Sequence, residues 1–339
     1  MRRALELAAL GLGGTSPNPS VGAVILTPSG EPVGEGRTAL VGGPHAEVVA
    51  LARAGGRARG GTAVVTLEPC DHTGRTGPCT RALLAAGIAR VVVGVRDPDA
   101  RAGGGADTLR AAGVDVETGV LAAEAAHQLR YWLTAVRRGR PYVIWKYAAT
   151  LDGRSAARDG TSRWITSPES RADVHALRGT VDAIIAGAGT VRADDPALTV
   201  RVPGTERRPL RVVVDSAGGT PAAARVRDGA APTWIATSAE VGSDPTGRVD
   251  LGKLMTALYA RGVRGALLEG GPTLAGAFLA AGLVDEVVGY LAPKLLGAGS
   301  AALGPAGVGT IAQARELDLV DVTRIGPDVR ITAVPKEER

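Results

Sequence analysis

Lysine, cysteine, aromatic residues and long apolar runs are all scarce in this chain of 339 residues. Only four of its 39 basic residues are lysines, two residues are cysteines and 3% are aromatic. No apolar run approaches the roughly 18 residues that a membrane-spanning helix needs, and the 48 glycines keep no three-residue period of the collagen type. With 45% hydrophobic and 22% charged residues, the composition predicts a globular protein without a membrane span.

The positive charge of the chain is small and widely spread. Basic residues exceed acidic ones by five at neutral pH, and the one short cluster consists of Arg137, Arg138 and Arg140. A nucleic-acid-binding surface usually carries a dense basic stripe interleaved with aromatic side chains. The sequence therefore predicts anionic small molecules as partners, and neither nucleic acid nor a membrane.

The cysteine content and the N-terminus favour a cytoplasmic protein. The N-terminal stretch has a basic start but carries Glu6 within a short apolar segment, which favours a helix over a signal peptide. A lone disulfide between Cys70 and Cys79 would rarely persist in the cytosol. We therefore expect the two thiols to have a different role.

Length and pattern predict two α/β domains. At about 150 residues per domain the chain has room for two, and helix and strand signals alternate in both halves. A helical stretch over residues 124–136 ends before Gly139-Arg140-Pro141, where proline disfavours its continuation. We therefore expect one domain at residues 1–140 and a second at 141–339.

The expected elements differ between the two halves. Neither half repeats with a fixed period, so the two domains are expected to be unrelated. The first half is expected to hold helices at 4–10, 45–54, 79–86, 107–112 and 124–136, and strands at 21–26, 62–67, 90–95 and 114–118. The second half is expected to hold a helix at 274–281 and strands at 142–147, 183–186, 211–215, 233–237, 266–269, 287–291 and 329–334.

One group of residues in the first half has the composition of a catalytic zinc site. His45 starts a predicted helix, Cys70 follows a predicted strand, and Cys79 opens the next helix. Zinc readily binds one imidazole and two thiolates, which leaves a fourth position open for water. Bound zinc lowers the pKa of that water towards neutrality and so provides hydroxide for attack. Glu47, two residues from His45, is placed to pass a proton to a leaving amine.

Less specific interpretations exist for the same residues. Two cysteines are often small buried apolar groups, and a histidine at a helix start is often a surface residue. A structural zinc would need a fourth protein ligand, for which His72 is the nearby candidate. A non-catalytic zinc scaffold would leave Glu47 without a role, and a nucleic-acid base deaminase would leave the second half without one.

The pattern His-x-Glu followed by Pro-Cys and a second Cys is the signature of zinc nucleobase deaminases. Here eight residues, 71–78, separate the cysteines, where the signature has two. This long form, together with the turn PNPSVG at 17–22, resembles the deaminase half of the bifunctional deaminase/reductase family of riboflavin biosynthesis. The resemblance implies a three-layer domain of the cytidine-deaminase type. It also implies that the substrate is contacted by Asn18, His72 and Arg75.

Two glycine-rich turns in the second half each follow a predicted strand. They are Gly187-Ala188-Gly189-Thr190 and Glu269-Gly270-Gly271-Pro272-Thr273. Backbone N–H groups at such strand-to-helix turns can bind phosphate. Neither turn is a complete dinucleotide fingerprint, and tight turns in a glycine-rich chain are an equal alternative.

Other segments of the second half resemble the reductase domain of the same family, in the expected order. They read KYAATLDG at 146–153, WITS at 164–167, GTVRADDPALTVR at 189–201 and APKLLG at 292–297. The resemblance implies a dihydrofolate-reductase-like fold that uses NADPH. The NADP-binding residues it implies are Ala148, Trp164, Thr190, Asp194, Ser216, Gly271, Pro272, Thr273, Leu274, Ala275, Gly276 and Ala277.

The resemblance also implies a set of substrate-binding residues in the second half. Arg178 and Arg201 are expected to face the substrate phosphate, because the planar guanidinium can bind phosphate with two hydrogen bonds. Lys146 and Asp152 are candidates for orienting or protonating the ribose oxygen. The remaining implied substrate-binding residues are Ser162, Leu198 and Glu269.

The chain departs from the family pattern at Thr38. After Glu35-Gly36 the family usually has an aromatic residue and then histidine, whereas this chain has Arg37-Thr38. That histidine normally lies near the substrate. The difference leaves an alternative open, a diverged paralogue that acts on a related pyrimidine or pterin in secondary metabolism with one active domain or two.

The sequence thus predicts a bifunctional enzyme that uses Zn²⁺ and NADPH. The first domain is expected to deaminate 2,5-diamino-6-ribosylamino-4(3H)-pyrimidinone 5′-phosphate with zinc-bound hydroxide and Glu47. The second domain is expected to reduce the ribosyl side chain to ribityl. The resemblance also implies a homo-oligomer joined through the reductase domain.

Overall fold

The chain folds into two compact units, Met1–Arg140 and Pro141–Arg339. A computed structural model describes residues 1–73, 77–99 and 102–336. Each unit has its own sheet and its own hydrophobic core. None of the helices in these described ranges is long and apolar enough to cross a membrane.

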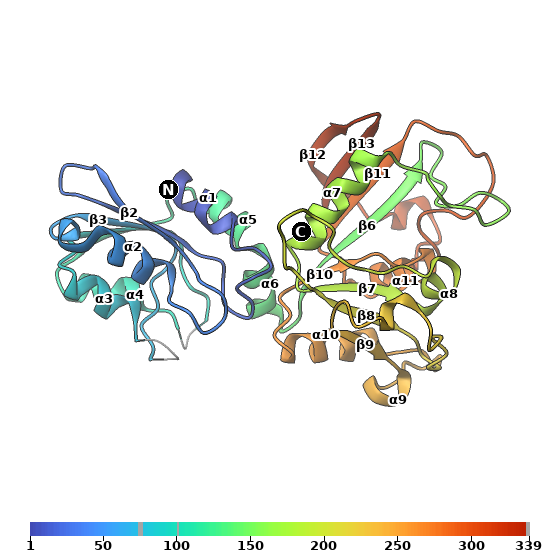
Figure 1. Ribbon diagram of the computed structural model, residues 1–339, viewed down its shortest axis with the longest axis horizontal. Coiled ribbons are helices and arrows are strands. Elements are labelled where there is room, and N and C mark those ends of the chain that lie inside the picture. Colours follow the sequence, from blue (N-terminus) through green and yellow to red (C-terminus); the bar gives the residue numbers. More distant parts are fainter. Residues whose placement is uncertain (74–76, 100–101, 337–339) are drawn as a thin grey trace. The chain divides into compact units, whose positions relative to one another are not determined.

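The first unit has a five-stranded sheet in the order β2-β1-β3-β4-β5. β1 pairs antiparallel with β2 and β3, and β3, β4 and β5 run parallel. Helices α1 and α5 lie on one side of the sheet and α2, α3 and α4 on the other (Figure 1), which gives three layers. The elements are α1 (Arg2–Ala9), β1 (Gly22–Leu26), β2 (Pro32–Arg37), α2 (Ala46–Ala54), a 3₁₀ turn (Gly55–Ala58), β3 (Thr62–Leu67), α3 (Cys79–Ala85), β4 (Arg90–Val95), α4 (Gly105–Ala111), β5 (Asp115–Thr118), α5 (Ala122–Gln128) and α6 (Arg130–Arg138).

Two glycines of β2 let α2 lie very close to the sheet. A Cβ atom at Gly34 would stand 2.2 Å from the carbonyl oxygen of Ala50, and one at Gly36 would stand 2.1 Å from that of Ala46. Only glycine fits at this spacing. Because β2 therefore lacks the alternating apolar pattern by which strands are recognised, the sequence prediction omitted it.

The second unit has an eight-stranded sheet in the order β12-β13-β11-β6-β10-β7-β8-β9. The six strands from β11 to β9 run parallel, and β13 and β12 join them antiparallel. The elements are β6 (Tyr142–Thr150), α7 (Pro168–Gly179), β7 (Ala183–Gly187), α8 (Ala188–Asp194), β8 (Leu210–Val214), a 3₁₀ turn (Arg225–Arg227), β9 (Thr233–Ala236), α9 (Ser238–Val241), α10 (Leu251–Ala260), β10 (Gly265–Leu268), α11 (Pro272–Ala280), β11 (Glu286–Ala292), a 3₁₀ turn (Ile311–Gln313), β12 (Leu317–Ile325) and β13 (Asp328–Pro335).

The core of the second unit lies between the parallel strands and two helices. Leu254 and Met255 of α10 and Phe278 of α11 pack with Val143 of β6 and Ile185 of β7. Parallel strands buried in this way read as continuous apolar runs, which is why the sequence predicts most of them within one or two residues. Their carboxyl ends meet along one edge of the sheet.

One predicted helix was wrong in detail, and several elements were not predicted, namely β2, α7, α8, α9, α10 and β12. The helix expected at 124–136 is two helices, α5 and α6, separated at Leu129. Strand β12 was not predicted, although it pairs with β13 along nearly its whole length. It is an edge strand, and most of its side chains are exposed, so no buried face marks it in the sequence.

Candidate functional site

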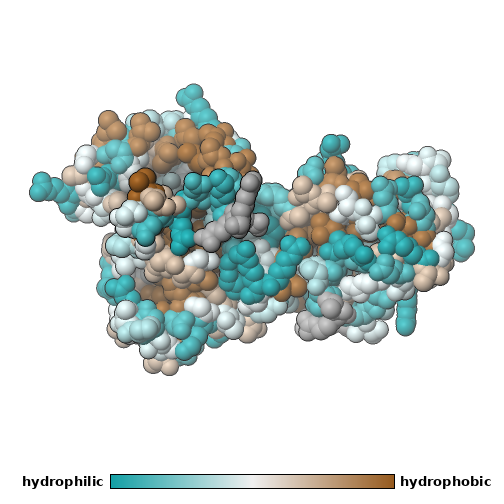
Figure 2. Space-filling model, turned by 180° about the vertical axis from the view of Figure 1, so that it is seen from behind, coloured by the Kyte–Doolittle hydropathy of each residue, from teal (hydrophilic) through white to brown (hydrophobic). Residues whose placement is uncertain are grey.

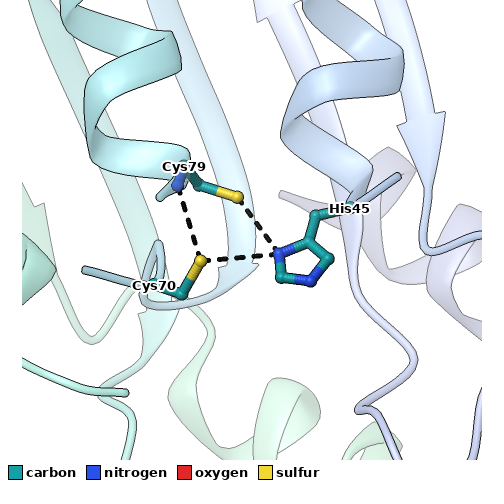
Figure 3. Close-up of side chains that lie close together, drawn as sticks. All are labelled: His45, Cys70 and Cys79. Carbon is teal, nitrogen blue, oxygen red and sulfur yellow. Dashed lines mark hydrogen bonds between the residues drawn. The ribbon is translucent and has the colours of Figure 1, made fainter. Parts of the chain in front are cut away.

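His45, Cys70 and Cys79 meet at one point of the first unit. His45 caps the start of α2, Cys70 lies in the loop after β3, and Cys79 is the first residue of α3. His45 Nδ1 lies 3.2 Å from Cys79 Sγ and 3.5 Å from Cys70 Sγ, and the backbone N–H of Cys79 donates to Cys70 Sγ at 3.4 Å (Figure 3). The three candidate ligand atoms all lie within 4.8 Å of one another. One imidazole and two thiols at this spacing are a donor set for zinc.

The electrostatics of the cluster favour a thiolate at Cys70. The hydrogen bond with the Cys79 side chain is the largest cause, and with the help of His45 it outweighs burial and lowers the pKa of Cys70 to about 4. The same pairing, together with burial, raises the pKa of Cys79. A thiolate, and not a thiol, is the form that binds a metal.

Glu47 is a buried carboxyl group in the first turn of α2, two residues after His45. Its side chain is almost fully covered, with 4% of the residue exposed. Burial is the main cause that raises its pKa above the usual glutamate value, and the charge of Cys70 acts in the same direction. A carboxyl group with a raised pKa can both accept and return a proton near neutral pH.

The other residues predicted for the first unit occupy different environments. Asn18 is half-buried in the turn before β1, where its backbone N–H donates to Thr15 at 2.9 Å. His72 is exposed in the loop between the two cysteines. The prediction for Arg75 lies outside the described residues.

Thr38 holds the backbone beside that turn. Its Oγ1 accepts a hydrogen bond from the N–H of Val21 at 3.0 Å, and its own N–H donates to the Val21 carbonyl at 2.9 Å. The side chain is buried. These two bonds extend the pairing of β1 with β2 towards Asn18, so threonine has a structural role at this position.

A small cavity adjoins the metal-ligand candidates. Its volume is about 420 Å³, and its wall includes Pro44 and Pro78, the neighbours of His45 and Cys79, together with Arg81. Arg81 was not singled out from the sequence. It could have been found from its position, because it lies in the first turn of α3, two residues after Cys79.

The second unit contains a large cavity at the carboxyl edge of its parallel strands. Its volume is about 1330 Å³, and its wall is formed by residues in or after β6, β7, β8 and β10. Ligands of open α/β sheets bind at this edge. The predicted residues that line it are Lys146, Ala148, Ser162, Trp164, Arg178, Thr190, Asp194, Leu198, Arg201, Ser216, Glu269, Gly271, Pro272, Thr273, Leu274 and Ala277.

Three residues predicted for the same site do not line the cavity. Ala275 is fully buried in the core, and a Cβ atom at Gly276 would stand 2.3 Å from the Pro305 carbonyl oxygen, so both belong to the packed side of α11. Asp152 instead fixes a turn, because its carboxylate accepts hydrogen bonds from the Thr150 hydroxyl and from two backbone N–H groups of residues 296 and 297. The Thr150 bond is the largest cause that lowers the pKa of Asp152 to about 2, so this carboxylate has no proton to donate.

A buried ion-pair network forms one wall of the cavity. Glu269 accepts hydrogen bonds from Arg178 Nε at 2.5 Å and Nη2 at 2.9 Å, and Lys146 Nζ lies 3.5 Å from the same carboxylate. Burial raises the pKa of Glu269, but the charges of Arg178 and Lys146 outweigh it and hold this pKa at about 2. Arg178 also donates to the Thr199 carbonyl at 3.0 Å.

This network differs from the expectation that Arg178 faces a phosphate. Its guanidinium is engaged on all sides by Glu269 and Thr199, so it fixes the cavity wall. Arg201 lines the same cavity, and its side chain has no partner among the described residues. Arg201 is therefore available to an anionic group, whereas Arg178 is not.

The segment Asp195–Arg201 is held in an unusual backbone conformation. Asp195 and Leu198 have φ of 41° and 48°, a left-handed region that non-glycine residues rarely adopt. Arg211 of β8, which is completely buried, stabilises the segment by donating to the Ala197 carbonyl at 3.1 Å. The Arg201 N–H donates to His175 Nδ1 at 3.2 Å. Arg211 was not predicted as a site residue, because within a strand it reads as an ordinary charged residue.

Two family models match the chain, one in each unit. The cytidine and deoxycytidylate deaminase zinc-binding region matches residues 1–95, and the RibD C-terminal domain matches residues 141–331. These matches confirm the predicted fold classes, a cytidine-deaminase-like first domain and a reductase domain of the dihydrofolate-reductase-like type.

Known proteins are similar to the chain over nearly its full length. The riboflavin biosynthesis protein RibD of Mycobacterium tuberculosis is 47% identical over 328 residues, which cover 96% of this chain and 93% of that protein. RibD of Escherichia coli is 43% identical, with 97% and 96% covered. Among solved structures, a diaminohydroxyphosphoribosylaminopyrimidine deaminase/5-amino-6-(5-phosphoribosylamino)uracil reductase of Thermotoga maritima has a TM-score of 0.90 at 36% identity, with 99% and 97% covered.

Similarity of this extent runs through both units and does not favour the alternative of a diverged paralogue. The predicted zinc and NADPH agree with the zinc-binding deaminase region and with the reductase domain. The chain therefore belongs to the RibD family, the bifunctional deaminase/reductase enzymes of riboflavin biosynthesis.

Proposed function

We propose that Met1–Arg140 removes an amino group from a phosphorylated ribosylaminopyrimidine and that Pro141–Arg339 then reduces its ribosyl group to ribityl. The substrate is 2,5-diamino-6-ribosylamino-4(3H)-pyrimidinone 5′-phosphate, in keeping with the activity named for the Thermotoga maritima relative. The observation that carries the proposal is the meeting of His45, Cys70 and Cys79 beside the buried Glu47.

The donor set of the first unit fits zinc. His45 offers a ring nitrogen, Cys70 is held as a thiolate, and Cys79 offers a second sulfur, whose proton would leave when the metal binds. Three protein ligands are typical of catalytic zinc, because a fourth position is left for water. When bound, zinc makes that water a nucleophile at the carbon that carries the amino group.

Glu47 moves the proton that this deamination requires. It accepts a proton from the attacking water and returns it to the leaving nitrogen, so that the C–N bond breaks, ammonia leaves and a carbonyl forms in its place. Its burial and raised pKa favour the protonated form between the two transfers. The burial of the carboxyl group also limits exchange of this proton with bulk solvent.

The cavity of the second unit fits NADPH together with a substrate. At about 1330 Å³ it exceeds the usual size of a pocket for one small ligand, and it lies where dinucleotides bind in α/β sheets. NADPH supplies the hydride for the ribosyl carbon when bound. In this proposal Lys146 donates a hydrogen bond to the ribose oxygen, and Arg201 binds the substrate phosphate.

A two-stage assay tests the proposed sequence of reactions. Purified enzyme given the diaminopyrimidine ribose phosphate without coenzyme is expected to release ammonia, and added NADPH is then expected to be oxidised. If ammonia is released only after NADPH has been added and oxidised, the proposed order is wrong. If neither signal arises from zinc-loaded enzyme, the substrate assignment is wrong.

Removing zinc is expected to stop the first reaction only. Chelation removes the metal itself, and Cys79→Ser removes a fully buried thiol ligand. With either change, ammonia release should fall below about one thousandth of the parent rate. NADPH oxidation with the already deaminated intermediate should persist, because each unit has its own core. Zinc content and both rates measure this. Equal loss of both activities would show that the metal has a structural role for the whole chain.

We also propose a cytoplasmic homo-oligomer that associates through β12. The free thiols of Cys70 and Cys79 suit a reducing compartment. On β12, the apolar side chains of Leu319, Val320 and Val322 are exposed, and an edge strand of this kind is suited to pairing with a second copy. Figure 2 shows an apolar area on the same unit.

The oligomer proposal predicts a change of mass in solution. Leu319→Asp places a charge in the centre of the exposed apolar face and should shift the chain towards the monomer at micromolar concentration. Leu40→Asp is the matched control, because Leu40 is equally exposed but lies in the other unit. Light scattering after gel filtration gives the masses. A dimer that persists in Leu319→Asp would exclude β12 as the interface.

A further inference from the structure

The cavity of the second unit has a feature that bears on coenzyme choice. In many dinucleotide-binding sheets a carboxylate at the end of a strand binds the 2′-hydroxyl of NADH, and an arginine nearby instead accommodates the 2′-phosphate of NADPH. Both residue types are present around the loop that follows β8. Asp215 directly follows β8, and Arg192 lies in the last turn of α8.

Asp215 lines the cavity, but its carboxylate is held by its own loop. One carboxylate oxygen accepts hydrogen bonds from both the N–H and the hydroxyl of Thr220, each at 2.6 Å. The residue is 3% exposed. Burial raises its pKa, but these bonds outweigh burial and lower it, so the carboxylate stays ionised and committed to Thr220. It is therefore a poor partner for a ribose hydroxyl.

Arg192 has the opposite character. It is exposed and lines the cavity, and its guanidinium forms no hydrogen bond or ion pair within the described ranges of the chain. Of the other cations of the wall, Arg178 is paired with Glu269, and Arg201 is assigned to the substrate phosphate. The charge of Arg192 helps to lower the pKa of Asp215, but its N–H groups remain free to donate. Such an arginine at the edge of a ligand cavity is suited to bind an anion of the ligand.

The loop after β8 leaves the guanidinium accessible. Gly219 lies beside it, since a Cβ atom built there would stand 3.8 Å from Arg192 Nη1. Because glycine has no side chain, nothing from this position covers the cation. Ser216, a predicted coenzyme-binding residue, lies on the same loop and also lines the cavity, with its hydroxyl held by the Val249 N–H at 3.1 Å.

From these contacts we infer that Arg192 binds the 2′-phosphate of NADPH and so sets the preference for NADPH over NADH. The inference rests on the proposed function in one respect, namely that the coenzyme occupies this cavity. Arg192 acts on specificity alone, because it lies on α8, after β7, whereas Lys146 and Glu269 lie on β6 and after β10.

Calorimetric binding of nucleotide fragments tests the inference without turnover. The parent enzyme is expected to bind adenosine 2′,5′-bisphosphate more tightly than 5′-AMP. In Arg192→Gln that preference should fall by about 10-fold to 100-fold, the size expected for charge-assisted hydrogen bonds. Affinity for 5′-AMP should be unchanged. Arg227→Gln, a change at an exposed arginine outside the cavity wall, should behave like the parent.

Kinetics provide a second measurement. In Arg192→Gln the KM for NADPH should rise by a similar factor, whereas kcat and the KM for NADH should stay close to the parent values. A variant that weakens NADPH and NADH equally would overturn the inference. It would also be overturned if the preference survived in Arg192→Gln and was lost in Arg248→Gln, which alters another arginine of the wall.

The outcomes also separate this inference from the proposed function. If the parent binds NADPH and the 2′-phosphate preference survives in Arg192→Gln, the coenzyme site stands and the role of Arg192 is wrong. If the parent binds neither NADPH nor adenosine 2′,5′-bisphosphate, the coenzyme assignment of the cavity is wrong, and the inference fails with it.

Discussion

Glu47→Gln should lower ammonia release by about 10³-fold, within the range that general acid–base groups contribute. Glutamine has nearly the same shape as glutamate but can neither accept the proton of the attacking water nor return it to the leaving nitrogen. The buried position of Glu47 excludes bulk water as a substitute. The rate of ammonia release at saturating substrate measures the loss, and zinc analysis of the same sample should give the parent content.

Two controls make the Glu47 result specific. Glu35→Gln removes a carboxylate of the same unit that pairs with Arg3 at the surface, and it should keep the parent rate. NADPH oxidation with the deaminated intermediate should also be unchanged in Glu47→Gln. If the variant releases ammonia within a few-fold of the parent rate, another group moves the proton, and the role assigned to Glu47 is wrong.

Glu269→Gln should destabilise the second unit by about 3 kcal/mol or more, because it leaves two buried cations facing each other. The side chains of Arg178 and Lys146 are 12% and 16% exposed, so solvent screens little of their repulsion. Unfolding of the second unit in a calorimetric scan should therefore move to lower temperature. The first unit should unfold as in the parent.

A second variant shows whether unpaired charge is the cause. In Arg178→Met combined with Glu269→Gln, the larger repelling partner is gone, and part of the lost stability should return. Glu240→Gln, at an exposed glutamate of the same unit, serves as the control. Equal stability of Glu269→Gln and the parent would mean that the ion pair contributes nothing to the fold. The double variant should also bind substrate weakly, because Arg178 holds the Thr199 carbonyl next to Arg201.

The metal-binding cluster was predictable from the sequence because its residues lie at the ends of strongly patterned elements. β3 and β4 are apolar runs whose observed bounds agree with the predicted ones, and they place Cys70 in the loop that leaves the sheet. His45 and Cys79 start helices, and helix starts of this fold converge at one side of the sheet. The spacing and residue types therefore carried enough information to bring the three side chains together.

The second unit was less predictable at the level of side chains. Most residues implied by the resemblance line the cavity, but the resemblance could not show that Arg178 and Glu269 bind each other or that Asp152 holds a turn. Which hydrogen-bond partner each of these side chains has depends on tertiary packing, and no local sequence pattern predicts it. The same limit applies to Arg211, whose partners come from several separate loops.

The glycines of β2 make the deaminase chemistry sensitive to changes far from any reacting atom. An alanine at Gly36 would push against the Ala46 carbonyl, which belongs to the first turn of α2, between His45 and Glu47. In a mutational scan, Gly34 and Gly36 should therefore tolerate substitution as poorly as the metal ligands. A shift of α2 that relieves this contact would move His45 and Glu47, so the protein would lose turnover while it still folds.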